Sequence, residues 1–349
     1  MIKRLIIQSD NSILAALKQM DKEQRKLLLV FQNDDFIGLI SIGDIQRAII
    51  NNVDLNSNIS SVLRKDIIIA KDEDSIESVR NKMLQIRAEY MPIVNEVGKI
   101  TKIIFWEDLF KETELPPKKQ FNLPIIIMAG GVGSRLKPIT NVLPKPLIPI
   151  GDKTIIEHIF ERFHRHGCYK FYISVNYKAE LIEYYLANQN LPYELSYFKE
   201  NKPMGTVGSL SLLKNQIKET FFVSNCDIII EEDYSEILEY HLNSGNEITV
   251  VAAIKNYNIP YGTIEFGING ELKELKEKPE LTFFINSGLY ILEPHLIDEI
   301  PENNFYHITD LIDKVKERKG KVGVFPVTEK SWRDIGEWDE YLKHKEDFI

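Results

Sequence analysis

The first part of the chain carries the same order of apolar and polar segments twice. In the first copy, residues 11–20 form a helical stretch, and the apolar runs 27–31 and 36–41 flank the polar turn 33–35. Two strands joined by a turn are therefore predicted, followed by a helix that opens near Asp44.

The second copy has apolar side chains at roughly helical spacing in residues 72–87, which predicts a helix. It continues with the strand 91–94, the turn 95–98, the strand 100–105 and the helix 106–110. Helix, strand, turn, strand and helix, present twice, resemble a pair of CBS motifs. The resemblance covers nearly all of residues 1–112.

A change of composition ends this part of the chain. Residues 111–123 are rich in charge, and a Pro-Pro pair interrupts the apolar periodicity. Proline lacks an amide donor and fixes φ, so this stretch suits an extended linker. We therefore expect a tandem CBS domain at 1–112, a linker at 113–123 and a second domain at 124–349. The alternative is a surface loop inside a single domain.

Strands and helices alternate after this linker. Strands are predicted at 124–128, 171–175, 193–198 and 221–224, and helices at 154–167, 178–187 and 207–215. This alternation predicts an α/β, Rossmann-like domain with a mainly parallel sheet and helices on both faces. Ligands of such sheets collect beyond the carboxyl ends of the strands.

A hairpin is predicted further along the chain. Asn269 and Gly270 separate the runs 263–266 and 272–275. An Asn-Gly pair supplies the positive φ values of a type I′ turn.

The overall composition is that of a soluble globular protein, with 44% hydrophobic and 27% charged residues. The net charge of -9 argues against a general nucleic-acid surface. Cys168 and Cys226 are far apart, so we expect neither a metal-ligand pair nor a redox pair. The N-terminal apolar run is too short for a signal peptide, and no apolar run reaches the roughly 18 residues of a membrane span. A cytoplasmic protein without nucleic-acid or membrane partners is expected.

Three glycines directly follow the first strand of the second domain. Gly130, Gly131 and Gly133 give a loop backbone angles that other residues avoid, and let amides approach phosphate oxygens. Arg135 and Lys145 follow, and a nucleoside triphosphate needs this combination of amides, guanidinium and ammonium. Three glycines alone fit an ordinary structural turn better, and their spacing matches neither the dinucleotide pattern nor the P-loop.

The longer segment MAGGVGSRLKPITNVLPKP, which contains this loop, resembles the signature of the nucleotidyltransferases that make nucleotide sugars. It departs from that signature in Ile139, where leucine is usual. The resemblance implies that the loop from Ala129 to Gly133 binds the nucleotide. It also implies that Arg135 holds the β- and γ-phosphates and that Lys145 neutralises charge on the α-phosphate.

Two aspartates are candidate metal ligands. Asp227 ends an apolar strand, where a carboxylate suits a hard cation such as Mg²⁺, although a turn or capping aspartate fits equally. The family resemblance implies that Asp227 binds catalytic Mg²⁺, with Cys226 in place of the usual glycine. It implies the second ligand at Asp334, where Glu337 replaces the usual threonine; the alternative is an aspartate that caps the last helix.

The substrate pockets are implied by shorter segments. PMGTVGSL resembles the family segment that places Gly205 and Thr206 beside the base and sugar, and its form favours GTP as donor. The family's YG, EKP and NSG segments imply sugar-phosphate contacts at Tyr261, Gly262, Glu277, Lys278, Asn286 and Gly288. Without the resemblance, a Glu-Lys pair is usually a solvated surface feature.

The front domain carries part of a nucleotide signature. Nucleotide-binding CBS motifs have a Ser or Thr and an Asp after the last strand, and Ser41 and Asp44 satisfy this in the first motif. The second motif keeps Asp108 but has Phe105 where the hydroxyl belongs. The resemblance implies at most one full site for an adenine nucleotide. The alternative is a domain that only packs or pairs two chains.

The resemblances together imply an enzyme that joins GTP and a sugar 1-phosphate into a GDP-sugar, and a homodimer. A CBS pair before a guanylyl-type transferase resembles the glucosamine-1-phosphate guanylyltransferases of bacterial legionaminic acid synthesis. Mannose 1-phosphate is the rival acceptor. A catalytically silent sensor of nucleotide sugars is the alternative to an enzyme.

Overall fold

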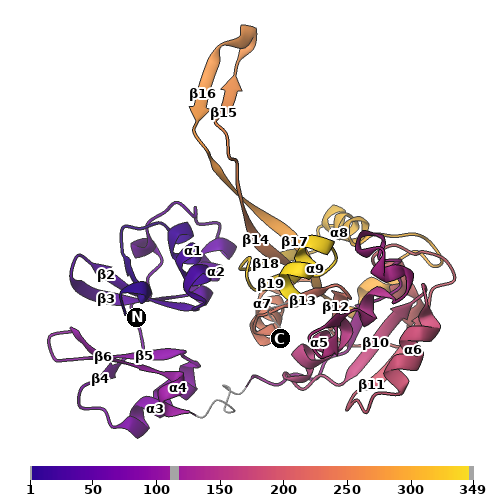
Figure 1. Cartoon of the computed structure of the whole chain (residues 1–349), viewed down its shortest axis with the longest axis horizontal. Helices are drawn as coiled ribbons and strands as arrows, with labels where there is room; N and C mark the ends of the chain where they lie inside the picture. Colours follow the sequence, from indigo (N-terminus) through magenta and orange to yellow (C-terminus); the bar gives the residue numbers. More distant parts are fainter. Residues whose placement is uncertain (1, 111–117, 346–349) are drawn as a thin grey trace. The chain divides into compact units, whose positions relative to one another are not determined.

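The structure is a computed structural model that describes residues 2–110 and 118–345. The chain divides into two compact units, Met1–Pro117 and Lys118–Ile349, and each is described by itself (Figure 1). The linker predicted at 113–123 lies partly outside the described residues, as do the ends of both predicted domains. Within the described ranges, every helix is too short or too polar to cross a membrane.

The first unit contains two small three-stranded sheets, one for each predicted motif, in the orders β1-β2-β3 and β4-β5-β6. Its strands are β1 (Ile6–Gln8), β2 (Leu27–Gln32), β3 (Asp35–Ser41), β4 (Ala70–Lys71), β5 (Tyr90–Val94) and β6 (Ile100–Phe105). Its helices are α1 (Ile13–Glu23), α2 (Ile42–Ile50), α3 (Ile76–Ile86) and α4 (Trp106–Leu109), with 3₁₀ turns η1 (Ile2–Leu5) and η2 (Ile59–Ser61). The repeated order predicted for the CBS pair is confirmed.

The two motifs share one core. Leu29 and Leu39 of the first motif pack in one cluster with Tyr90 and Ile103 of the second. The Tyr90 hydroxyl donates a hydrogen bond of 2.8 Å to the carbonyl of Leu27. Each motif therefore buries the apolar face of its small sheet against the other, because neither is large enough to bury that face alone.

The second unit is built on a seven-stranded sheet in the order β11-β10-β7-β12-β17-β14-β18. Its strands are β7 (Ile125–Met128), β10 (Lys170–Val175), β11 (Glu194–Lys199), β12 (Phe221–Asn225), β14 (Ile248–Asn258), β17 (Glu280–Leu292) and β18 (Val322–Val327). The pairs are parallel except for the two that β17 makes with β12 and β14. The predicted mainly parallel sheet is confirmed.

Helices and short two-stranded ribbons complete the second unit. The helices are α5 (Ile155–His164), α6 (Ala179–Ala187), α7 (Tyr234–Ser244), α8 (Ile308–Glu317) and α9 (Trp338–Lys345). The 3₁₀ turns are η3 (Ser134–Leu136), η4 (Ile139–Asn141), η5 (Lys145–Leu147), η6 (Gly208–Leu213), η7 (Ile268–Gly270) and η8 (Pro294–Glu299). The ribbons are β8 (Pro149–Ile150) with β9 (Lys153–Thr154), β13 (Ile228–Ile230) with β19 (Trp332–Asp334), and β15 (Thr263–Phe266) with β16 (Leu272–Lys276).

One predicted helix is different. Residues 207–215 were expected to be helical, and the structure has the shorter 3₁₀ turn η6 there. A Cβ on Gly208 would lie 2.6 Å from the carbonyl oxygen of Asn304, so the backbone packs directly against another segment. Glycine at this point favours that close approach and disfavours a regular α-helix.

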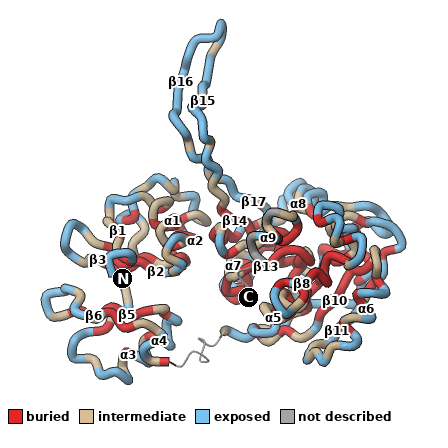
Figure 2. The backbone as a smooth tube through the Cα atoms, in the orientation of Figure 1, coloured by how far each residue is buried: buried red, intermediate tan, exposed pale blue. Residues whose placement is uncertain are grey.

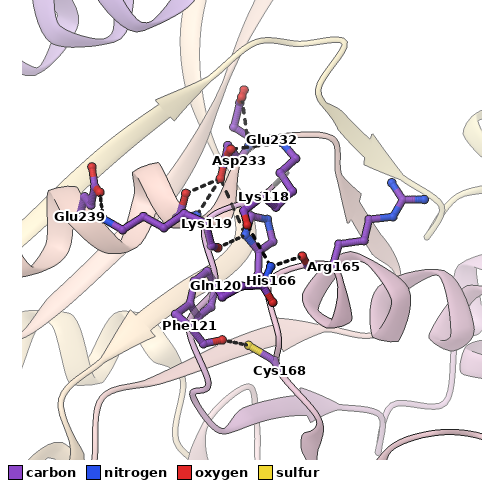
Figure 3. A network of polar contacts seen from close by, with 11 residues as sticks. Lys118, Lys119, Gln120, Phe121, Arg165, His166, Cys168, Glu232, Asp233 and Glu239 are labelled. Carbon is purple, nitrogen blue, oxygen red and sulfur yellow. Dashed lines mark hydrogen bonds and ion pairs between the residues drawn. The ribbon is translucent and has the colours of Figure 1, made fainter. Parts of the chain in front are cut away.

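The segment that follows the undescribed part of the linker belongs to the second unit (Figure 3). The Phe121 amide donates to the carbonyl of His166 at 2.7 Å, and the Lys118 ammonium lies 3.2 Å from the Asp233 carboxylate. The ring of His166, itself buried, stacks on Phe121 and on Tyr234. Residues 118–121 are thus fixed to the loop after α5 and to the start of α7.

A long two-stranded arm leaves the sheet. Strands β14 and β17 continue beyond their sheet neighbours, and the ribbon of β15 and β16 forms the outer end (Figure 1). Nearly all of this outer end is exposed (Figure 2). Asn269 and Gly270 have φ of 62° and 77°, which confirms the predicted positive-φ turn.

Candidate functional site

The glycine loop lies at the carboxyl end of the central strand β7. This strand is buried between β10 and β12, and its three isoleucines are fully buried. The Ala129 amide donates to the carbonyl of Ser174 at 3.1 Å, which continues the sheet pairing into the loop. The loop therefore opens at the edge where ligands of parallel sheets bind.

Two glycines of this loop are packed closely against other side chains. A Cβ on Gly130 would lie 2.9 Å from a carboxylate oxygen of the buried Glu200. Gly133 has φ of +68°, and a Cβ there would lie 2.9 Å from Thr140 and 3.3 Å from the Cβ of Lys145. Both positions require glycine, because one leaves no room for a side chain and the other adds a left-handed backbone.

Lys145 and Asp227 form a buried ion pair. Their side chains are 10% and 12% exposed, and the ammonium contacts Oδ2 of Asp227. Lys145 begins η5 between two prolines that restrict its backbone. A buried charge needs a partner, and each member of this pair is the other's partner.

Asp334 is brought beside this pair by the ribbon of β13 and β19. Ile228 pairs with Asp334 in that ribbon, and the Ile335 amide donates to the Asp227 carbonyl at 2.8 Å. A Cβ on Gly336 would lie 2.7 Å from Asp227 Oδ2, 2.7 Å from Asp334 Oδ1 and 2.9 Å from Lys145 Nζ. Two carboxylates and one ammonium therefore converge around Gly336.

The electrostatics of Asp334 follow from this crowding. Burial raises the pKa of the Asp334 carboxyl, and the negative charge of Asp227 raises it further. A hydrogen bond from the Gly336 amide and the positive charges of Lys145 and Arg135 oppose that rise. Two like charges this close favour a cation between them.

The residue beside Asp227 carries no chemistry of its own. Cys226 is buried, and burial raises the pKa of its thiol to about 12. A protonated, enclosed thiol is a poor nucleophile.

Arg135 lies at the open side of the site. Its side chain is 58% exposed and forms an ion pair of 2.8 Å with Glu337. Glu337 occupies the position where the family signature has threonine, so an acidic side chain here holds the cation that the signature assigns to phosphate.

A cavity of about 450 Å³ opens between these elements. The predicted site residues that line it are Arg135, Thr206, Asp227, Asn286, Gly288 and Asp334. The Thr206 hydroxyl accepts a hydrogen bond of 2.8 Å from the Ile308 amide at the start of α8, which fixes that helix end at the cavity wall. Gly205 has φ of +78° and packs against the Tyr306 backbone.

The NSG segment is also at the cavity. The Asn286 side-chain oxygen accepts hydrogen bonds from the Gly288 amide at 3.1 Å and the Tyr290 hydroxyl at 2.9 Å. A Cβ on Gly288 would lie 2.6 Å from the Asn225 amide nitrogen. The structure thus brings the end of β12 against β17 beside Asp227.

The other predicted sugar-phosphate residues are not at this cavity. Tyr261, Gly262, Glu277 and Lys278 lie on the arm, where all four are exposed. Tyr261 is 75% exposed. The sequence motifs predict that these residues contact the sugar phosphate. In the structure of one chain, however, none of the four lines the cavity.

The predicted CBS ligands are engaged within the first unit. Ser41 and Asp44 form a capping box at the start of α2, and Asp44, 3% exposed, also pairs with Arg47 and Arg64. Asp108 accepts a hydrogen bond of 2.8 Å from the Phe105 amide. Both aspartates therefore lie in the first turn of the helix that follows the last strand of their motif.

Several residues at the site were not among the predicted site residues. His307 and Trp332 line the cavity, and the Trp332 indole donates to the Ser287 carbonyl at 3.1 Å. Glu200 lies beneath the glycine loop, where it accepts hydrogen bonds from the Ser174 hydroxyl and, at 3.3 Å, from the Met204 amide. In the sequence, Glu200 is a single acidic residue directly after a strand, which gives no reason to assign it to a site. Only the fold shows that it lies against Gly130.

Comparison with known families accounts for both units. Residues 125–349 match the nucleotidyl transferase family model, and residues 1–51 and 59–114 match the CBS domain model. The first match covers more than half of the chain, and the protein belongs to the nucleotidyl transferase family, with a CBS pair in front.

Relatives and solved structures of known name are similar to the second unit. The catalytic subunit beta of mannose-1-phosphate guanylyltransferase from Drosophila melanogaster is 32% identical over 62% of this chain and 60% of its own length. The bifunctional protein GlmU of Methanococcus maripaludis is 36% identical over 61% of this chain and 52% of its own length. The chain therefore spans between half and two thirds of these relatives.

A crystal structure of HddC from Yersinia pseudotuberculosis complexed with GMP-PN has a TM-score of 0.52 and 26% identity. The match covers 65% of this chain and all of HddC. It supports the same sheet architecture for the second unit.

Proposed function

We propose that the protein is a sugar-1-phosphate nucleotidyltransferase. The observation that carries the proposal is the convergence of Lys145, Asp227 and Asp334 beside a glycine loop and a cavity of about 450 Å³. The name of the relative from Drosophila melanogaster, a mannose-1-phosphate guanylyltransferase subunit, agrees with it.

The proposed reaction needs no base. A phosphate oxygen of the sugar 1-phosphate attacks the α-phosphorus of the nucleoside triphosphate, and a P–O–P diphosphate link forms. The bond from the α-phosphorus to the bridging oxygen of the β-phosphate breaks, and pyrophosphate leaves with the electron pair. A phosphate is already anionic, so catalysis consists of positioning and charge neutralisation. Lys145 would face the α-phosphate and Arg135 the departing phosphates.

Asp227 and Asp334 fit a hard divalent cation, because two carboxylates near each other are oxygen ligands of the kind Mg²⁺ prefers. When bound, Mg²⁺ would neutralise phosphate charge. The Asp227 carboxylate would then contact both the metal ion and the Lys145 ammonium.

GTP is the proposed donor. Guanine has two N–H donors side by side on its Watson–Crick edge, and the buried Glu200 carboxylate beneath the glycine loop has acceptor capacity beyond its two present bonds. The guanylyltransferase names of relatives and the GMP-PN bound in the HddC structure agree with this choice.

Glucosamine 1-phosphate is the proposed acceptor, within legionaminic acid synthesis, because the CBS pair precedes a transferase domain whose short motifs are of guanylyl type. Mannose 1-phosphate is the alternative, favoured by the names of relatives such as the one from Drosophila melanogaster. The adenine-nucleotide site proposed for the first unit rests on Ser41, the last residue of β3, and on Asp44 in the first turn of α2.

The test is pyrophosphate release from four nucleoside triphosphates, each offered with a panel of hexose 1-phosphates and Mg²⁺. GTP with one hexosamine or hexose 1-phosphate should give turnover. Lys145→Ala should lower kcat by about 10²–10³-fold, as loss of an electrostatic donor commonly does. Lys170→Ala, an exposed lysine at the opposite end of β10, is the control. Full activity of a folded Lys145→Ala protein, or no turnover of any pair by the wild type, would contradict the proposal.

A further inference from the structure

Two sugar-phosphate motifs meet each other on the arm. A Cβ on Gly262 would lie 3.1 Å from a carboxylate oxygen of Glu277, and the Ile259 amide donates to the Pro279 carbonyl at 3.0 Å. Tyr261, Glu277 and Lys278 are exposed around this point. The motifs thus form one cluster, although they come from opposite strands.

This cluster is well separated from the cavity of its own chain. The pairing of β14 with β17 runs without a register shift from Ala252 opposite Asn286 to Asn258 opposite Glu280. Six residues of strand at about 3.3 Å each place the cluster roughly 20 Å beyond Asn286. Folding it back onto its own cavity would break this continuous ladder of backbone hydrogen bonds.

The outer ribbon is amphipathic, with one apolar face in solvent. Ile264 pairs with Leu275 and Phe266 with Leu272, which puts these four side chains on one face. They are 59%, 58%, 73% and 59% exposed, in that order. The opposite face carries Thr263, Glu265, Glu274 and Lys276. An isolated two-stranded ribbon is marginally stable in water, so its apolar face calls for a packing partner.

The cavity of each chain has little positive charge for a second phosphate group. Among the described residues that line it, Arg135 is the one side chain with a permanent positive charge, and Glu337 pairs with it. Asp227 and Asp334 add negative charge. A sugar 1-phosphate brings more negative charge, and Lys278 is an exposed cation of the motif cluster on the arm.

We infer that the arm of one copy of this chain packs on a second copy and supplies Glu277 and Lys278 to the second copy's cavity. The inference rests on the proposed function for the role of these two residues. In a pair related by a two-fold axis, each copy gives its arm and receives its partner's. The cavity is then complete only in the pair.

Subunit complementation tests this arrangement. Lys145→Ala removes the core lysine and leaves the arm intact, and Lys278→Ala does the opposite. The two variants are co-expressed with different affinity tags and purified through both tags in turn. Each mixed pair then has one cavity with Lys145 intact and a partner arm with Lys278 intact. Roughly half of wild-type activity is expected, because one of two sites in a two-fold pair is complete.

Two results would overturn the inference. If the arm serves its own chain, every cavity of the mixed pair has one defect, and the mixture stays as inactive as either variant alone. If the differently tagged chains do not purify together, no pair exists.

The packing of the apolar face is tested separately from catalysis. Phe266→Asp should convert the pair to single chains in sedimentation velocity, and Thr263→Asp on the opposite face is the matched control. A pair that survives Phe266→Asp would contradict the arm contact. If the wild type is inactive on all substrates, the proposed function is contradicted. The sedimentation experiment does not depend on activity, so it would still decide whether the arm binds a second copy.

Discussion

At the scale of single residues, the site is dominated by charge placed close together. Lys145 neutralises Asp227, and Asp334 lies beside them with a raised pKa, first because it is buried and then because Asp227 is negative. A carboxyl whose pKa is raised by folding binds protons more tightly in the folded state than in the unfolded one. Its ionisation therefore destabilises the metal-free fold as pH rises through that pKa.

This sign gives a test of the metal role of Asp334. Asp334→Asn removes the charge that disfavours the metal-free fold, so its thermal unfolding temperature at neutral pH, without Mg²⁺, should not be lower than that of the wild type. Turnover with Mg²⁺ should fall by about 10²-fold or more, since one cation ligand is lost. In the wild type, the Mg²⁺ concentration for half-maximal activity should rise as pH falls toward the raised pKa. A lower unfolding temperature with unchanged Mg²⁺ activation would show that Asp334 is structural only.

Glu200 gives a second test at this scale. A hydrogen bond to a charged acceptor contributes about 1.5–3 kcal/mol, so Glu200→Gln should lower kcat/KM for GTP about 10- to 100-fold. Inosine triphosphate lacks the guanine 2-amino group and should lose less from the same change. A parallel loss with both nucleotides would mean that the carboxylate supports the loop at Gly130 and does not read the base.

At the scale of elements, the sequence predicts the strands and turns that depend only on neighbouring residues. Three consecutive isoleucines in β7, and the Asn269-Gly270 pair, predict a buried strand and a turn, and both are present. The 3₁₀ turn η6 was missed because its glycine meets the distant Asn304 backbone. Local pattern carries no information about such a contact.

Pairings between distant segments decide the rest of the site. Asp334 reaches Asp227 because β19 pairs with β13, an antiparallel pair between segments far apart in the chain. Motif resemblance suggested that both aspartates bind one metal, but neither periodicity nor spacing could predict the pairing itself. The same limit applies to the arm, since motif spacing cannot show that the ladder of β14 and β17 holds Glu277 away from Asn286.

The segment that enters the second unit offers a test of element packing. Asp233 caps α7, where it accepts a hydrogen bond of 3.1 Å from the Ser235 amide, and it pairs with Lys118. Asp233→Ala should lower the free energy of unfolding by about 1–2 kcal/mol through loss of the cap. Glu239→Ala breaks the neighbouring ion pair with Lys119. The Lys119 and Glu239 side chains are 56% and 49% exposed, so this change should lower the free energy of unfolding by less than about 0.5 kcal/mol. Urea unfolding measures both, and equal effects would contradict this ranking.

At the scale of the whole molecule, the first unit needs a role of its own. Its strands and helices follow the order of the CBS pair, and Asp44 lies in the first turn of α2, at the position expected for a ribose contact. Asp44 is held by Ser41, Arg47 and Arg64, while the two arginine side chains are 58% and 49% exposed. Two exposed guanidinium groups beside this buried carboxylate suit the phosphate of a nucleotide.

An adenine nucleotide should therefore bind to the full chain, at a site that GTP does not occupy. Calorimetric titration of AMP and ATP, with saturating GTP present to fill the second unit, should give one site per chain. Arg64→Ala should weaken it about tenfold, because a charge-assisted bond to phosphate contributes about 1.5–3 kcal/mol when enclosed and less when half-exposed. Lys65→Ala removes the same charge from the next, exposed residue and should leave the affinity unchanged. Equal loss in both variants would indicate general attraction of a basic surface. A flat titration of the wild type would mean that the first unit has a packing role and binds no adenine nucleotide.

If binding is found, the factor by which the adenine nucleotide changes the affinity for GTP must equal the factor by which GTP changes the affinity for the adenine nucleotide.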